Sequence, residues 1–223
     1  MVQTVLMTDQ SVIIQAGEKR KMPKKRIEDP GVRKRQILDA ARLALRKTPY
    51  HELSMDDVAR TARISKGLLY LYFKDKEQLF AAATHEIIAE LGERVRKAPK
   101  TASPLKNLEA ILSGLMAFGE SNSEYATQFV GEQLAAGKHA EALQMSFQAF
   151  LSELGGRIQE CVDAGLMRVH DTQMSAEALI ELAKLYMRRK YLLKKLSRPL
   201  PAYAPEVLDL FINGFGPKGT RRS

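Results

Sequence analysis

The chain has 223 residues, and 35 lysines and arginines stand against 26 acidic residues, which gives a formal charge of +9. That length suffices for one or two domains with a proper core, and a hydrophobic fraction of 45% is ordinary for a globular protein. No run approaches the 18 apolar residues that a membrane span needs, and Met1 to Gln15 lacks the basic start of a signal peptide. The single cysteine, Cys161, excludes an intramolecular disulfide and predicts a buried, inert thiol in a cytoplasmic protein.

Residues 1–30 show no sustained periodicity and are expected to form a mobile basic arm. Six bases lie between Lys19 and Arg26, and the true start could be Met1 or Met22. A solvated tail is the favoured interpretation, and an arm that follows DNA phosphates or enters a minor groove is the alternative. Residues 33–80 add eleven bases against six acids, so the positive excess lies toward the N-terminus.

Two short helices are predicted after a first helix at about 33–47. Ser54 is a good N-cap, and Asp57, three residues later, completes a capping box. Ser65 can cap a second helix directly after a short turn, and Ile64 and Leu69 stand where a hydrophobic staple would form. Two capped helices separated by about one turn are typical of a helix-turn-helix.

The second helix is expected to have an inner and an outer face. If Leu69 and Phe73, four apart, point into the core, Lys66, Gly67, Tyr70 and Leu71 lie opposite. A lysine, a glycine that permits close approach and a phenolic hydroxyl are all usable against a DNA backbone or base edge. A small helical subdomain with an ordinary surface is the alternative, which two successive cap-and-staple signals disfavour. Because so short a helix cannot bury three leucines, Leu71 or Leu68 should face the groove and could pack on a thymine methyl.

A family resemblance rests on these residues. The segments Leu53–Ala59, Ile64–Phe73 and Lys74–Phe80 resemble the DNA-binding domain of the TetR (tetracycline-repressor type) family, over about Arg33 to Glu90. Two departures are an arginine, Arg63, where the family commonly has glycine in the turn, and a leucine, Leu68, where threonine is common. The resemblance implies a dimeric repressor that binds operator DNA and is released by a small ligand. The candidate DNA-binding residues are Ser54, Ser65, Lys66, Gly67, Leu68, Tyr70, Leu71, Tyr72 and Lys76.

The remaining segments are also predicted to be helical. Asp75 and Gln78 form another capping box for a helix that continues toward Arg96, and 97–104 is expected to be a hinge. Further helices are expected at 105–120, 125–136, 139–164, 175–195 and 206–213, with Ser175 as one N-cap and Gly165 and Gly214 as terminators. The fold class is therefore all-α. The expected divisions are a mobile arm (1–30), a helix-turn-helix domain (31–91), a ligand-binding and dimerisation bundle (92–214) and a disordered tail (215–223).

The segments after the hinge contain two features that predict partners, a small ligand and a second copy of the chain. Flexible and aromatic residues after the hinge suit a cavity for a small apolar inducer, although most of them must form core. The pocket candidates are Met116, Tyr125, Gln128, Phe129, Met145 and Phe150. The helix 175–195 is apolar on two faces, which with 206–213 predicts a homodimer interface, and a purely internal core is the alternative.

The sequence gives no support for catalysis. The four histidines are scattered without metal-ligand spacing, and no nucleophile motif is present, so neither a metal nor a cofactor is expected. We therefore expect a DNA-binding transcriptional regulator of double-stranded operator DNA. A ligand-independent DNA-binding protein is the first alternative, and an enzyme built on the C-terminal bundle is the second.

Overall fold

The computed structural model describes residues 29–123, 137–168 and 171–214, and in these ranges every regular element is a helix. The all-α prediction is therefore confirmed. The expected N-terminal arm, the expected helix at 125–136 and the expected tail at 215–223 lie outside the described residues.

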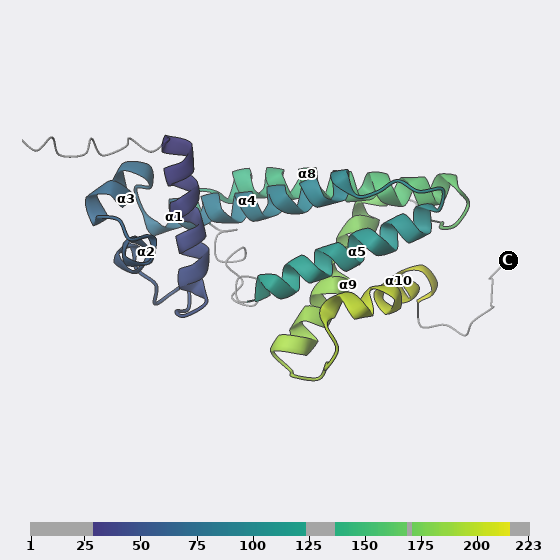
Figure 1. Ribbon diagram of the computed structural model, residues 1–223. Helices are drawn as coiled ribbons and strands as arrows, with labels where there is room; N and C mark the ends of the chain where they lie inside the picture. Colours follow the sequence, from purple (N-terminus) through teal and green to yellow (C-terminus); the bar gives the residue numbers. More distant parts are fainter. Residues whose placement is uncertain (1–28, 124–136, 169–170, 215–223) are drawn as a thin grey trace, which may run out of the picture.

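Three helices form the N-terminal domain at one end of the molecule: α1 (Pro30–Leu45), α2 (Met55–Ala62) and α3 (Lys66–Tyr72) (Figure 1). Helix α1 begins three residues before the predicted start, because the Asp29 carboxylate accepts a hydrogen bond from the Gly31 N–H at 2.8 Å and Pro30 occupies the first helical position. The three helices enclose a compact apolar core. Its fully buried members include Ile37, Leu38, Leu45, Val58, Leu69, Leu79 and Phe80.

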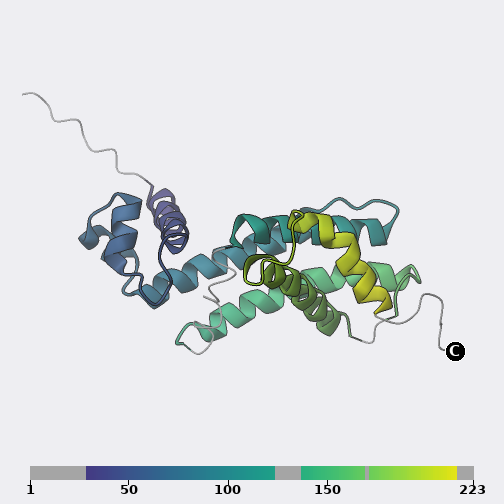
Figure 2. The same cartoon turned by 90° about the horizontal axis from the view of Figure 1, so that it is seen from below.

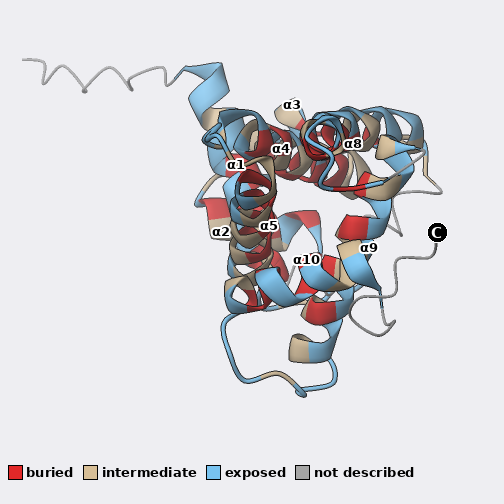
Figure 3. Ribbon diagram, turned by 90° about the vertical axis from the view of Figure 1, so that its right-hand side faces the viewer, coloured by how far each residue is buried: buried red, intermediate tan, exposed pale blue. Residues whose placement is uncertain are grey.

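Helix α4 (Lys76–Lys97) leaves this domain and enters the C-terminal bundle, where α8 (Ala140–Asp163) runs beside it in the same direction (Figures 1 and 2). Helix α5 (Pro104–Ser121) returns toward the N-terminal domain, and α9 (Thr172–Tyr191), the 3₁₀ turn η1 (Leu200–Tyr203) and α10 (Ala204–Asn213) cover it. The buried faces of these helices point toward one another (Figure 3). They form a second core that includes Leu108, Leu112, Met116, Leu151, Leu154 and Ile158.

Two glycines end helices as the sequence predicts. Gly165 has φ +68°, and the N–H groups of Gly165 and Leu166 donate to the carbonyls of Val162 and Cys161 at 2.9 Å each. This pair of bonds is the Schellman arrangement, in which the left-handed residue folds the chain back over the last turn. Gly214 likewise follows α10 with φ +64°. Cys161, close by, is fully buried, and burial raises the pKa of its thiol.

The prediction that Ser175 caps the helix after Gly165 is wrong. Helix α9 begins at Thr172, and the Asp171 carboxylate accepts from the N–H groups of Gln173 and Met174 at 2.9 and 3.0 Å. Ser175 lies inside the first turn, where its hydroxyl donates to the Asp171 carbonyl at 2.6 Å. A carboxylate that satisfies two free N–H groups at once is the stronger cap. The helix also ends at Tyr191, four residues before the predicted end.

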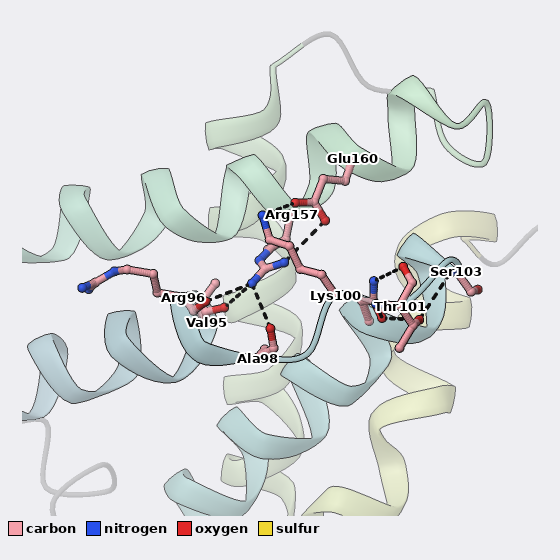
Figure 4. A network of polar contacts seen from close by, with 9 residues as sticks. Val95, Arg96, Ala98, Lys100, Thr101, Ser103, Arg157 and Glu160 are labelled. Carbon is pink, nitrogen blue, oxygen red and sulfur yellow. Dashed lines mark hydrogen bonds and ion pairs between the residues drawn. The ribbon is translucent and has the colours of Figure 1, made fainter.

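The connection from α4 to α5 is held by a residue of α8 rather than being a free hinge (Figure 4). The Arg157 guanidinium is buried, with 5% of the residue exposed, and Nη2 donates to the carbonyls of Val95, Arg96 and Ala98 at 2.9, 3.2 and 3.2 Å. The Val95 and Arg96 carbonyls belong to the last turn of α4, where no further turn supplies N–H donors, and Ala98 directly follows the helix. The Val95 carbonyl also accepts from the Ala98 N–H at 3.4 Å. The end of α4 is therefore fixed to α8 by a charged side chain.

Candidate nucleic-acid interface

Helix α2 is held at its start by the predicted capping box. The Ser54 hydroxyl accepts from the Asp57 N–H at 3.2 Å, and the Asp57 carboxylate accepts from the Ser54 N–H at 3.0 Å. The Ser54 side chain and backbone bonds hold the pKa of Asp57 below its usual range, so the carboxylate is charged at neutral pH. Ser54 is exposed, and its hydroxyl serves the helix while lying at the surface.

The turn between α2 and α3 has the left-handed geometry for which glycine is suited, although an arginine occupies it. Arg63 has φ 55° and ψ 42°, and the following Ile64 N–H donates to the Ala59 carbonyl at 3.0 Å. Ser65 then caps α3 by accepting from the Leu68 N–H at 3.2 Å. The departure from the family pattern at Arg63 therefore leaves the turn intact and places a non-glycine residue in a costly conformation.

Helix α3 has the two faces that its sequence predicts. Leu69 and Phe73 are buried at 0% and 2% exposure and anchor the helix on the N-terminal core. On the opposite side Tyr70 is 42% exposed and Leu71 82%, while Lys66 and Gly67 are also exposed. Leu68 and Tyr72 lie between the faces and are half-buried. The outer face is thus available to a partner without rearrangement of the core.

Lys66 forms an ion pair across the helix-turn-helix. Its Nζ lies 2.8 Å from Asp56 Oδ1 in the first turn of α2, and both side chains are more than half exposed. The hydrogen bond to Asp56 raises the pKa of Lys66, so the lysine remains charged at neutral pH. An exposed pair of this kind is weak and can exchange Asp56 for another anion.

Lys76, the first residue of α4, has a structural partner that the sequence did not reveal. Its Nζ donates to the carbonyls of Tyr50 and Leu53 at 2.9 and 3.0 Å and lies 4.6 Å from the centroid of the Tyr50 ring. The lysine therefore ties α4 to the loop between α1 and α2. An ammonium group has three donors, so one remains for a phosphate.

The start of α4 is capped as predicted, with one difference. The Asp75 carboxylate accepts from the Gln78 N–H at 2.7 Å, whereas the Gln78 side chain accepts from the Lys74 N–H at 2.7 Å and not from Asp75. Asp75 also accepts a 2.6 Å hydrogen bond from Lys138 Nζ, which precedes α8. That bond is the chief reason that the pKa of Asp75 lies below its usual range.

In the described residues, the C-terminal bundle also contacts the N-terminal domain apart from α4 itself. Lys138 binds Asp75, Leu143 near the start of α8 is buried in the N-terminal core, and Arg46 Nη2 donates to the Ser121 carbonyl at the end of α5 at 3.3 Å. The sequence does not predict these contacts, because they join residues far apart in the chain. They make the position of the N-terminal domain dependent on the bundle.

The expected ligand pocket is only partly described. Met116 and Phe150 are buried, at 1% and 3% exposure, in the bundle core. Met145 on α8 is 67% exposed and does not join that core, so its place in a pocket remains a prediction. Tyr125, Gln128 and Phe129 lie outside the described residues.

A hollow of about 380 Å³ lies between α4 and α5. Its lining consists of Glu90, Glu93, Arg94, Lys97, Ala98, Ala110, Ile111 and Gly114. Half of these residues are charged, which does not suit an apolar ligand. Of the expected pocket residues that the structure describes, Met116, Met145 and Phe150, none is among them. No helix in the described part of the chain is long and apolar enough to cross a membrane.

Comparisons with known proteins agree with this geometry. Residues 37–83 match the family model described as bacterial regulatory proteins, tetR family. An uncharacterised HTH-type transcriptional regulator, YhgD of Bacillus subtilis, is 26% identical over 153 residues, which is 67% of this chain and 80% of that protein. The HTH-type transcriptional regulator BetI of Serratia proteamaculans is 34% identical over 95 residues, or 41% of this chain, and the match spans only 48% of BetI.

A solved structure shares the fold over most of the chain. The transcriptional regulator FadR from Bacillus subtilis, in complex with stearoyl-CoA, superposes with a TM-score of 0.70 at 20% sequence identity over 82% of this chain and 99% of that one. Helix α3 is exposed in a helix-turn-helix and the matched relatives are transcriptional regulators, so the chain is a DNA-binding transcriptional regulator and not an enzyme. Its helix-turn-helix domain, over residues 37–83, belongs to the tetR family of bacterial regulatory proteins.

Proposed function

We propose that the protein is a cytoplasmic repressor that binds a pseudo-palindromic operator as a homodimer and leaves it when a small apolar ligand binds. The observation that carries the DNA-binding part is the outward face of α3, where Lys66, Gly67, Tyr70 and Leu71 are exposed while Leu69 and Phe73 hold the helix from within. Such a helix lies in the major groove, with the preceding helix across the backbone.

The proposed contacts are divided between phosphates and bases. Lys66, Tyr70 and the third N–H of Lys76 would bind phosphates, and exposed Gly67 would permit close approach. Ser54 and Ser65, which cap the two helices at the surface, would lie against the backbone, as would the accessible side of Tyr72. Leu68 is half-buried, which leaves Leu71 as the better placed leucine for a base edge.

The homodimer is supported by apolar side chains that the bundle leaves uncovered. Leu185 on α9 is 36% exposed, and Leu192 and Leu193 directly after it are 54% and 52% exposed. Leu185 and Leu192 belong to the second apolar face that the sequence predicts for this helix, whereas Leu179 and Ala183 of its first face are buried in the core. With the half-buried Phe211 and Ile212 of α10, they offer a surface for the same helices of a second copy.

Ligand release would act through α4, the helix that both domains share. At its N-terminal end, Asp75 is bound by Lys138 and Lys76 donates to the Tyr50 carbonyl. Its C-terminal end is held by Arg157. A ligand that repacks the core around Met116 and Phe150 would tilt α4 and change the separation of the two α3 helices. Because the FadR structure holds stearoyl-CoA, a long-chain acyl-CoA is the first compound to test.

The dimer and DNA contacts can be tested together. Sedimentation at micromolar concentration should give twice the 25.0 kDa chain mass, and a monomer with and without DNA would contradict the dimer.

The phosphate contact of Lys66 is tested by Lys66→Ala. This change should weaken the affinity for all DNA sequences alike, and it should reduce the slope of log K against log salt concentration by about one unit, because one phosphate contact is lost. Asp56→Ala is the matched control, since it breaks the same ion pair but keeps the cation, and it should not reduce the slope.

The ligand-independent alternative predicts a different result. Acyl-CoA titrated into the protein–operator complex should lower operator affinity, and Phe150→Leu should alter that response while DNA affinity without ligand is retained. An operator affinity that no acyl-CoA changes would favour the ligand-independent alternative over release by this ligand class.

A further inference from the structure

Leu71 is the most exposed large apolar side chain in the described part of the chain, at 82%. It is not needed to anchor α3, because Leu69 and Phe73 already fill the inward positions. Leaving a leucine in water forgoes the stabilisation that burial gives, on the order of 1.5–3 kcal/mol for a side chain of this size. The exposed position leaves this side chain free to contact a partner outside the chain.

Gly67 lies one helical turn before Leu71 on the outer face of α3. A Cβ at Gly67 would have no side chain and no other element within 4 Å, so the space there is open. The Leu71 side chain also lies beyond that distance, and a flat group can therefore approach the Gly67 backbone closely beside Leu71.

Charged and polar groups lie beside this open surface and identify the kind of partner. Lys66, adjacent to Gly67, is a cation held only by an exposed ion pair, and the Tyr70 side chain is 42% exposed next to Leu71. An apolar side chain framed by a cation and a phenol on a helix-turn-helix suits the major groove better than it suits an apolar protein surface.

We infer that Leu71 is a specificity-determining residue that contacts the C5 methyl group of a pyrimidine in the major groove, with Gly67 providing the room for that base to approach. The inference rests on the proposed function. Leucine cannot hydrogen-bond to a base edge or to a phosphate, and the C5 methyl is the apolar group that base edges present in that groove. Thymine carries this methyl, and so does 5-methylcytosine.

The test begins with an operator selected by the full-length protein from random duplexes, with binding measured by fluorescence anisotropy. Each thymine is then replaced by uracil, which removes only the methyl. One position in each half-site should lose about fourfold in affinity, the equivalent of about 0.8 kcal/mol for one buried methyl-sized group. In an operator variant that carries cytosine at that position, replacing this cytosine by 5-methylcytosine should increase the affinity by a similar factor. A response of the thymine and uracil pair alone would identify thymine as the ligand.

Two variants show whether Leu71 makes the contact. Leu71→Ala should bind the thymine and uracil operators equally, whereas the matched change Leu68→Ala, on the half-buried neighbour, should keep the fourfold difference. Because Leu71 is so exposed, Leu71→Ala should also retain the thermal unfolding midpoint, so that a loss of response cannot come from misfolding.

Three outcomes would overturn the inference. They are a uracil scan without a responding position, a Leu71→Ala protein that still discriminates, or a loss of discrimination in Leu68→Ala alone. In each of these cases tight, sequence-specific binding by the protein would leave the proposed function standing. Failure to select any duplex would instead contradict the proposed function itself.

Discussion

Two turns in this protein are fixed in different ways. The turn between α2 and α3 contains Arg63 and Ser65, and its backbone bonds and the Ser65 cap join residues within five positions of one another. Its long-range bond, from Gln36 Nε2 to the Ala62 carbonyl at 3.2 Å, comes from α1 of the same domain. The turn between α4 and α5, residues 98–103, has local bonds between Thr101 and Asn107, and in addition Arg157 of α8 bonds to Ala98 and to the end of α4, 59 to 62 positions back along the chain. The first turn is thus held within the N-terminal domain, whereas the second is also held by a helix of the bundle.

This difference matters for regulation. A turn whose bonds lie within the N-terminal domain does not depend directly on the packing of the bundle, which suits a surface that must match DNA. A turn that depends on a remote arginine makes the end of α4 sensitive to the packing of α8. A change in the packing of the bundle can therefore move the end of α4 while the internal geometry of the helix-turn-helix is kept.

The largest effect is expected from removing the remote arginine. Arg157→Ala should lower the free energy of unfolding by about 3 kcal/mol, because three carbonyls at the end of α4 lose a charged donor inside the protein. Urea unfolding followed by circular dichroism measures it. Arg96→Ala is the control, since its ion pairs with Glu93 and Glu153 are half-exposed and should contribute less than 1 kcal/mol. Equal effects of the two changes would show that the α4–α5 turn does not depend on Arg157.

A smaller effect of opposite sign is expected at the local turn. Arg63→Gly should raise the free energy of unfolding by about 0.5 kcal/mol, because glycine adopts φ 55° without steric cost, which outweighs its larger entropy in the unfolded chain. Arg63→Val should be destabilising, since a β-branched residue tolerates this conformation poorly. The urea midpoints of the two variants check this. A less stable glycine variant would mean that the Arg63 side chain itself stabilises the turn.

The smallest effect concerns the ion pair that joins the two domains. The Lys138 hydrogen bond depresses the pKa of Asp75 in the folded protein, so its stabilising contribution is present above the unfolded pKa and is lost as the pH falls through the folded value, below about pH 4. Lys138→Met should therefore move acid unfolding to higher pH. Ellipticity at 222 nm during acid titration measures it, with Lys184→Met, from the exposed pair with Glu181, as the control. Coincident acid transitions for the Lys138 variant and the unaltered protein would contradict this coupling.

The sequence by itself determined the parts of the structure that arise from short-range bonds. Three such features are the capping box of Ser54 and Asp57, the cap at Ser65 and the inward position of Leu69. Each depends on residues within about two helical turns of one another. Each is a hydrogen bond or a helical spacing that a short segment specifies alone. For this reason the helix-turn-helix and its exposed face could be predicted residue by residue.

Only the tertiary structure decided the features that need two distant segments to meet. Arg157 at the end of α4, Lys138 at Asp75 and Leu143 in the N-terminal core have ordinary surroundings in the sequence and acquire their roles by docking. The exposure of Met145, at 67%, was likewise decided by which helix faces pack together. Local bonds can be deduced from local sequence, whereas which helix faces meet is decided by the packing of the whole chain, because the same apolar face can bury itself against several neighbours.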